Sequence, residues 1–256
     1  MTGSKLRAPH WVLRDRLSPT ARPRLRRLAD PLLAPVGSIR NARRAGARLT
    51  ITFDDGPDPR HTPGILDALA RHDVKATFFM LSEAAEAHPE LARRVVAEGH
   101  EIALHGANHD RLTRLSPAEV EARVRGGRDR LERVVGRPLR WFRPPFGSQS
   151  LRTWFQTRRA GLRVVVWTTD LRDWTETKPA DVARAGVEAA ASGAILLMHD
   201  GIGSPDPDNP APEPKFDRAE AVDQLLTELL ARGWKPVTVG ELLATAHPVH
   251  SAWFRP

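Results

Sequence analysis

From residue 49 onward, short apolar runs alternate with segments whose apolar residues recur at helical spacing. The apolar runs predict strands over 49–53, 77–81, 101–104, 140–142, 164–167, 194–198 and 235–239. The intervening segments predict helices over 63–72, 83–98, 117–136, 151–160, 180–191 and 217–230. About seven repeated strand–helix units predict parallel strands, arranged either as an open doubly wound sheet or as a closed or distorted barrel.

The composition is typical of one folded body. The chain has 256 residues, of which 41% are hydrophobic and 27% charged, a balance too apolar for general disorder. It has no cysteine, which excludes disulfides, thiolate zinc sites, iron–sulfur clusters and cysteine nucleophiles. The strand–helix rhythm contains no linker, so we expect one α/β domain over 48–245, an N-terminal extension over 1–47 and a C-terminal tail over 246–256.

The positive charge is concentrated near the N-terminus. The net charge is +8, yet residues 1–48 alone hold twelve Lys and Arg against two Asp, so the rest of the chain is slightly acidic. We therefore expect no nucleic-acid partner for the main domain. The basic arm is suited to peripheral contact with an anionic membrane or a cell-wall polymer.

Targeting signals in the sequence are weak. No apolar run reaches the length of a transmembrane helix, and the arm lacks the apolar core of a secretory signal. The pair Arg26 and Arg27 resembles the start of a twin-arginine signal, but Asp30 follows it closely. We expect a cytoplasmic protein and leave export open.

Polar residues follow the predicted strands at their carboxyl ends. In a parallel sheet or barrel these ends share one face, where sites are built, so residues far apart in the sequence can converge there. The residues at these ends are Asp54, Asp55, His105, His109, Arg143, Asp170, Asp173, His199 and Asp200.

Two of these histidines have the spacing of a metal site. His105 and His109 are four residues apart and can face one ion, although such a pair is also common on protein surfaces. Asp54 and Asp55 fit a strand end followed by a turn, but adjacent carboxylates repel each other unless one is neutralised. Two histidines and one carboxylate, with positions left for water, form the pattern of a catalytic divalent metal. The other carboxylate then remains as a general base.

The polar residues belong to five ordered motifs. These motifs are Thr52-Phe53-Asp54-Asp55-Gly56-Pro57, His105-x-x-x-His109, Arg143-Pro144-Pro145-Phe146, Asp173-Trp174 and Leu197-Met198-His199. In order and approximate spacing they resemble the polysaccharide deacetylases of carbohydrate esterase family four, over about residues 48–245. The resemblance implies a distorted (β/α) barrel of about seven parallel strands that removes acetyl groups from N-acetylated sugars. It also implies a divalent metal, usually zinc, with cobalt, nickel or manganese as alternatives.

The resemblance assigns roles to individual residues. It makes Asp55, His105 and His109 the metal ligands, Asp54 the catalytic base, and Arg143 the residue that orients this base. In this interpretation a metal-bound water attacks the acetyl carbonyl while Asp54 takes the proton.

The remaining motif residues surround the leaving group and the acetyl group. By the same resemblance, His199 is the catalytic acid and Asp173 holds its ring. The backbone N–H of Phe146 is an oxyanion-hole donor, and Trp174 and Leu197 form walls of the acetyl pocket. Protonation by His199 matters because an amine is a poor leaving group.

One position departs from the family pattern, and the substrate stays open. Gly106 stands where the family usually has Ser or Thr, which predicts a looser loop around the metal-ligating histidines. An O-deacetylase of acetylated carbohydrate and a non-catalytic carbohydrate-binding relative are the alternatives, and the retained Asp54 and His199 argue against the second. A chitin oligomer, peptidoglycan, a glycolipid and a small biosynthetic intermediate all remain candidate substrates. The Pro- and Asp-rich segment 201–215 either shapes one wall of the cleft or forms a surface excursion.

Overall fold

The computed structural model describes residues 37–203 and 214–255. Most of the basic extension and most of the segment 201–215 lie outside the described residues, so the expectations for them stay predictions.

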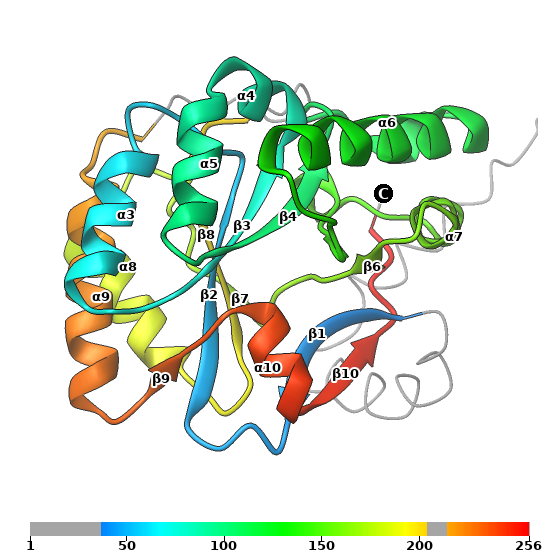
Figure 1. Cartoon of the computed structure of the whole chain (residues 1–256). Coiled ribbons are helices and arrows are strands. Elements are labelled where there is room, and N and C mark those ends of the chain that lie inside the picture. Colours follow the sequence, from blue (N-terminus) through cyan, green and yellow to red (C-terminus); the bar gives the residue numbers. More distant parts are fainter. Residues whose placement is uncertain (1–36, 204–213, 256) are drawn as a thin grey trace, which may run out of the picture.

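A curled parallel sheet forms the centre of the fold (Figure 1). Its strands follow the order β6-β5-β4-β3-β2-β8-β7, and β9 pairs with the start of β2. All strand pairings of this sheet within the described residues are parallel, which confirms the predicted distorted barrel of about seven parallel strands. The strands are β2 (Arg48–Asp54), β3 (Thr77–Leu81), β4 (Glu101–Gly106), β5 (Trp141–Phe142), β6 (Arg163–Val164), β7 (Thr169–Asp170), β8 (Ile195–His199) and β9 (Lys235–Pro236).

Alternate residues of the strands face two different cores. Phe78 and Met80 of β3 belong to the large cluster that includes the apolar faces of the helices, whereas Phe79 packs with Ile195 and Val165 in a second cluster. The helices are α3 (Thr62–Arg71), α4 (Ser82–Ala87), α5 (Pro89–Ala97), α6 (Pro117–Val135), α7 (Leu151–Arg159), α8 (Pro179–Glu188), α9 (Arg218–Ala231) and α10 (Val239–Thr245), with 3₁₀ turns at Leu112–Arg114 and Pro145–Gly147. Within residues 37–203 and 214–255, no helix is both long and apolar enough to span a bilayer.

Three predicted elements differ in the structure. The strand expected over 164–167 ends early, as β6 at Val164, and a separate strand, β7, follows at Thr169–Asp170. The helix expected over 83–98 is divided into α4 and α5 at His88, because Pro89 has no N–H to continue the first helix and starts the second. The strand expected over 235–239 stops at Pro236, since Thr238 caps α10 and its hydroxyl accepts the Glu241 backbone N–H at 3.1 Å. A capping box in the sequence therefore competes with the strand pattern and prevails.

The folded body extends beyond both predicted domain boundaries. Strand β1 (Ser38–Arg43) pairs antiparallel with β10 (His247–Ser251), so parts of the predicted extension and tail join each other. The Ile39 carbonyl accepts the Val166 N–H at 2.8 Å, and Ile39 itself is buried in the second cluster. This strand pair therefore packs against the sheet near β6, although only two of the six β1 residues are apolar.

Candidate active site

The carboxyl ends of the strands bring the predicted site residues together. Asp54 ends β2 and lies in register with His199, the last residue of the neighbouring strand β8. His105 is on β4, and Arg143 follows β5 directly. The shared edge that the sequence predicted is therefore present in the structure.

Asp55, His105 and His109 form one compact cluster. Asp55 Oδ1 lies 3.2 Å from His105 Nε2 and 3.3 Å from His109 Nε2, and one ligand atom from each residue lies within 4.8 Å of the others. Asp55 adopts a left-handed φ of 77°, which an aspartate tolerates better than most residues. This local turn lets Asp54 and Asp55 reach the same site, although successive strand residues point to opposite faces.

The donor set of this cluster fits a divalent metal. His105 Nδ1 lies 2.9 Å from the Arg143 carbonyl, and because a carbonyl only accepts, Nδ1 carries the proton and Nε2 keeps its lone pair for a ligand. Burial alone would raise the pKa of Asp55, but His109 and His105 hold it well below its usual range. Asp55 Oδ1 is buried and has no hydrogen-bond partner among the described residues. A carboxylate oxygen and imidazole nitrogens that lie this close together are ligands that zinc accepts.

The side chain of Arg143 holds the carboxylate of Asp54. The guanidinium is fully buried, and its Nη1 donates to Asp54 Oδ1 at 2.6 Å and to Thr52 Oγ1 at 2.8 Å. Nε and Nη2 donate to the Val165 and Val166 carbonyls at 3.3 and 3.4 Å. The guanidinium is thus anchored by the backbone and fixes one oxygen of the Asp54 carboxylate; its role in orienting a catalytic base stays a prediction.

His199, which is partly buried, and the fully buried Asp173 form a second pair. His199 Nδ1 lies 2.7 Å from Asp173 Oδ1, and the His199 backbone N–H donates to Asp173 Oδ2 at 2.8 Å. Burial alone would lower the pKa of His199, but the Asp173 carboxylate, with smaller contributions from Asp55 and Asp54, raises it to about 9. His199 is therefore an imidazolium at neutral pH, the form that can donate a proton.

The three predicted substrate contacts lie on different elements. Phe146 has a left-handed φ of 58° inside a 3₁₀ turn, and the centroid of its ring is 4.0 Å from that of His109. Leu197 is buried on β8. Trp174 is 38% exposed, and its indole N–H donates to Asp170 at 3.1 Å. The roles assigned to these three residues stay predictions.

Gly106 has a conformation that a side chain would not adopt easily. Its φ is 148°, and a Cβ there would lie 2.7 Å from the Asn108 carbonyl oxygen. The loop between the two histidines is therefore built for glycine, and both histidines still reach Asp55. The predicted loosening of the metal-ligating loop stays a prediction.

Asp200 and Arg218 are two buried residues near the site to which the sequence assigned no role. The Thr62 hydroxyl donates to Asp200 Oδ2 at 2.7 Å. Burial, together with the nearby Asp55 and Asp54, raises the pKa of Asp200 to about 7. Arg218, the first residue of α9, donates to Asp173 at 2.7 Å. The sequence gives one signal for a special role of Arg218, which is that this cation stands at a helix N-terminus, where the helix dipole favours an anion.

Gly56→Ala should disturb the turn that carries Asp55. A Cβ at residue 56 would clash with Asp200 Oδ2, and this carboxylate is buried and hydrogen-bonded to the Thr62 hydroxyl. We expect a loss of roughly 1–3 kcal/mol in unfolding free energy, together with weaker zinc binding. Chemical denaturation and zinc titration measure the two effects.

Gly126→Ala is the matched control, because a Cβ there meets nothing within 4 Å inside helix α6. It should leave zinc affinity unchanged and stabilise the fold slightly. A Gly56→Ala variant as stable as this control, with normal zinc affinity, would contradict the prediction.

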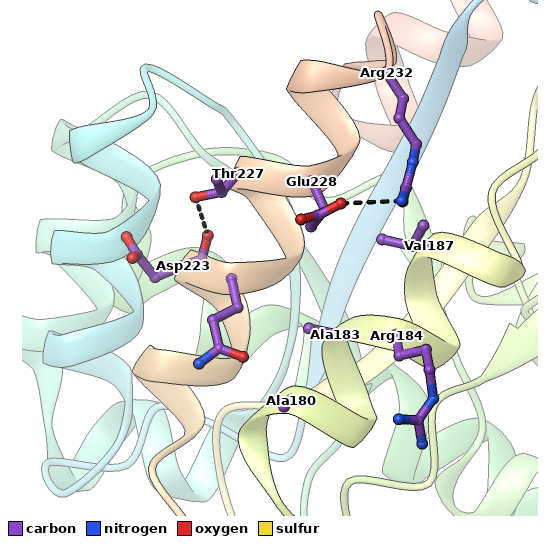
Figure 2. Close-up of a pocket in the computed structure, with 9 residues that line it drawn as sticks. Ala180, Ala183, Arg184, Val187, Asp223, Thr227, Glu228 and Arg232 are labelled. Atoms are coloured by element: carbon purple, nitrogen blue, oxygen red, sulfur yellow. Dashed lines mark hydrogen bonds and ion pairs between the residues drawn. The ribbon is translucent and has the colours of Figure 1, made fainter.

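A separate pocket of about 440 Å³ lies between α8 and α9 (Figure 2). Ala183 and Val187 form part of its apolar lining, and a Glu228–Arg232 ion pair of 3.0 Å lies at its edge. None of the candidate site residues Asp55, His105 and His109 lines this pocket. The pocket therefore belongs to the outer helical layer rather than to the candidate active site.

Comparisons with known proteins agree with the motif-based resemblance. The family model for polysaccharide deacetylase matches residues 41–165. A peptidoglycan-N-acetylglucosamine deacetylase of Bacillus cereus is 35% identical over 201 residues, covering 78% of this chain and 89% of the relative. A chitooligosaccharide deacetylase of a Bradyrhizobium species is 40% identical over 152 residues, covering 59% of this chain and 69% of the relative.

Solved structures share the fold. A peptidoglycan N-acetylglucosamine deacetylase in complex with 4-naphthalen-1-yl-N-oxidanyl-benzamide superposes with a TM-score of 0.74 at 27% identity, covering 84% of this chain and 97% of that one. A CE4 family pseudoenzyme from Bacillus anthracis gives a TM-score of 0.71 at 25% identity, covering 80% and 68%. Since the fold includes a pseudoenzyme, activity has to be argued from the residues of the site.

Proposed function

Because the chain belongs to the polysaccharide deacetylase family, carbohydrate esterase family four, we propose that it is a metal-dependent hydrolase removing acetyl groups from N-acetylglucosamine-type units. The observation that carries the proposal is that two hydrogen-bonded pairs, Asp54 with Arg143 and His199 with Asp173, lie at the same strand ends as the Asp55 cluster. The relatives bear names of peptidoglycan and chitooligosaccharide deacetylases, which supports an N-acetylated carbohydrate as the substrate.

Asp55, His105 and His109 are the residues that would hold the metal. A divalent cation, zinc in the first place and cobalt, nickel or manganese as alternatives, supplies a Lewis acid that lowers the pKa of water and polarises an amide carbonyl. The anionic Asp55 and the Nε2 lone pair of His105 support this assignment.

The other residues of the site divide the proton transfers between them. Asp54, held by Arg143, takes a proton from the attacking water. The new C–O bond leaves a negative charge on the former carbonyl oxygen, which the Phe146 backbone N–H stabilises. His199 gives its proton to the sugar nitrogen as the C–N bond breaks, so that acetate and a free amine result.

Acetate release tests the proposal. The full chain, loaded with zinc, is incubated with chitin oligomers, peptidoglycan, a glycolipid, a small N-acetylated sugar and an O-acetylated carbohydrate. We expect acetate from at least one N-acetylated substrate. Release from the O-acetylated substrate alone would favour the O-deacetylase alternative, and release from none would favour a carbohydrate-binding relative. The presence of both Asp54 and His199 argues against a relative without activity.

The dependence of turnover on pH should follow His199. Its pKa is raised to about 9, so turnover that needs the imidazolium falls as pH rises through this value. Asp173→Asn removes the main cause of the raised pKa while burial still lowers it. We expect the alkaline limb of the kcat profile to move down by about two pH units.

Asp170→Asn is the control for this experiment, because Asp170 accepts from Trp174 and the Arg172 backbone instead of from His199. Its alkaline limb should match that of the unmodified protein. An unchanged limb in Asp173→Asn would exclude His199 as the acid.

The basic arm and the location of the protein stay proposals. We propose that the protein is cytoplasmic and that residues 1–36 make peripheral contact with an anionic membrane; a cell-wall polymer would be the partner if the protein is exported. Truncation has to stop at residue 36, since β1 begins at Ser38 and pairs with β10. Loss of vesicle or cell-wall binding with unchanged acetate release would separate the arm from catalysis.

A further inference from the structure

A buried arginine outside the five sequence motifs holds the His199–Asp173 pair. Arg218 Nη1 donates to Asp173 Oδ2 at 2.7 Å, to the Asp173 carbonyl at 3.2 Å and to the His199 carbonyl at 3.3 Å. Asp173 Oδ2 therefore receives Arg218 and the His199 backbone N–H, while Oδ1 faces His199 Nδ1. The arginine contacts both the side chain and the backbone of the pair.

The position of Arg218 runs against local preference. It is the first residue of α9, directly after the N-cap Asp217, where the helix dipole favours negative charge. Its side chain is only 3% exposed, and a buried guanidinium is costly unless it is paired. The unfavourable position of Arg218 has to be offset by a tertiary contact, and the ion pair with the fully buried Asp173 carboxylate provides this contact.

We infer that Arg218 is a positioning residue for the acid His199 and acts through Asp173. By fixing Oδ2, it leaves Oδ1 aligned with His199 Nδ1, so that Nε2 is the ring nitrogen left to deliver the proton. The inference rests on the proposed function, because His199 has this task only in a deacetylase. It adds a residue 45 positions away from Asp173 to the machinery.

The positive charge of Arg218 also disfavours the protonated form of His199, because two nearby cations repel each other. The carboxylates that raise the pKa of His199 are those of Asp173 and of the two aspartates at the end of β2. A neutral residue in place of Arg218 removes a cation from beside them, so the pKa of His199 should rise further. The alignment of Asp173 is lost at the same time. Among the described residues, the charged groups near His199 are Asp54 at the end of β2, Asp55 directly after it, Asp173 from the segment before α8 and Arg218 from α9. Asp200 follows His199 in the chain.

The test compares Arg218→Met with Arg218→Lys in the zinc-loaded full chain. NMR titration of the His199 imidazole, assigned with a His199→Gln variant, reads the pKa without turnover. For Arg218→Met we expect this pKa to rise by about one unit. We also expect kcat to fall about 10- to 100-fold, the usual cost of losing an outer partner of a site residue, with KM little changed. Arg218→Lys, which keeps the charge and a donor, should restore most of both.

Arg71→Met is the matched control, since Arg71 also pairs with an aspartate of α9, Asp223, at 2.9 Å, but on the surface. It should change neither the pKa of His199 nor kcat. In an Asp173→Asn background, Arg218→Met should add little to the loss in kcat, because its effect passes through Asp173.

An equal loss of kcat in both backgrounds, or a folded Arg218→Met protein in which both the pKa of His199 and kcat are unchanged, would overturn the inference. If Arg218→Met does not fold, Arg218→Gln replaces it, because glutamine keeps a donor and lacks the charge. If the unmodified protein releases no acetate, the proposed function fails, whereas the NMR titration still decides whether Arg218 controls His199.

Discussion

Asp54→Asn is expected to retain zinc and to lose roughly 100- to 10,000-fold in kcat, the range typical of losing a general base. Asp54 lies outside the Asp55 cluster, and its Oδ1 is occupied by Arg143 at 2.6 Å. An amide at this position still accepts a hydrogen bond from Arg143 but cannot take a proton from water. Metal content and acetate release, measured on the same preparation, separate the two properties.

The substitution also affects stability, and a control is needed. Arg143 is fully buried, so removing the charge of Asp54 leaves a buried cation without its counter-charge, at a cost of up to about 3–5 kcal/mol. Thr52→Val removes another bond to Arg143, of 2.8 Å, and leaves the carboxylate in place. It should reduce stability and retain most of kcat. If zinc is lost from Asp54→Asn, the assignment of the two aspartates is reversed.

The edge of the sheet could be predicted because it depends on residues close in sequence to each strand end. Asp54, His105 and His199 end or follow apolar runs, and parallel strands bring such ends to one face wherever the helices between them lie. The partners within the motifs, Arg143 with Asp54 and Asp173 with His199, follow from the family resemblance. The structure places both pairs in contact.

The contacts that escaped prediction connect distant segments without a periodic signal. Thr62 and Asp200 are 138 positions apart, and each alone reads as a turn or cap residue. Strand β1 pairs with β10 across nearly the whole described chain, and its alternation of apolar and polar residues is too short to distinguish it from the basic arm. From the sequence alone Arg218 is indistinguishable from a solvent-exposed helix residue, and only the structure shows that it donates to Asp173. In these cases the tertiary partner, rather than the local sequence, determines the role.

Asp55→Asn should have the opposite signature from Asp54→Asn, with the loss of metal as the primary effect. Asp55 Oδ1 lies between His105 Nε2 and His109 Nε2, and the two histidines hold the pKa of Asp55 below its usual range, so it contributes a full negative charge. An amide has no charge and is a weaker ligand for zinc. We expect zinc affinity to fall by more than the roughly 10- to 100-fold that follows loss of an outer partner of a ligand, and kcat to approach background.

Chelation of the unmodified protein should reproduce the loss of activity, and added zinc or cobalt should reverse it. The same concentration of zinc should not restore Asp55→Asn. Asp58→Asn is the matched control, because Asp58 is three residues further along the same segment and pairs with Arg60 at 2.7 Å instead of with the histidines. It should bind zinc normally. Full activity in metal-free protein would refute the metal dependence. Normal zinc binding by Asp55→Asn would exclude Asp55 as a ligand, because its carboxylate is the one anionic group in this cluster of described residues.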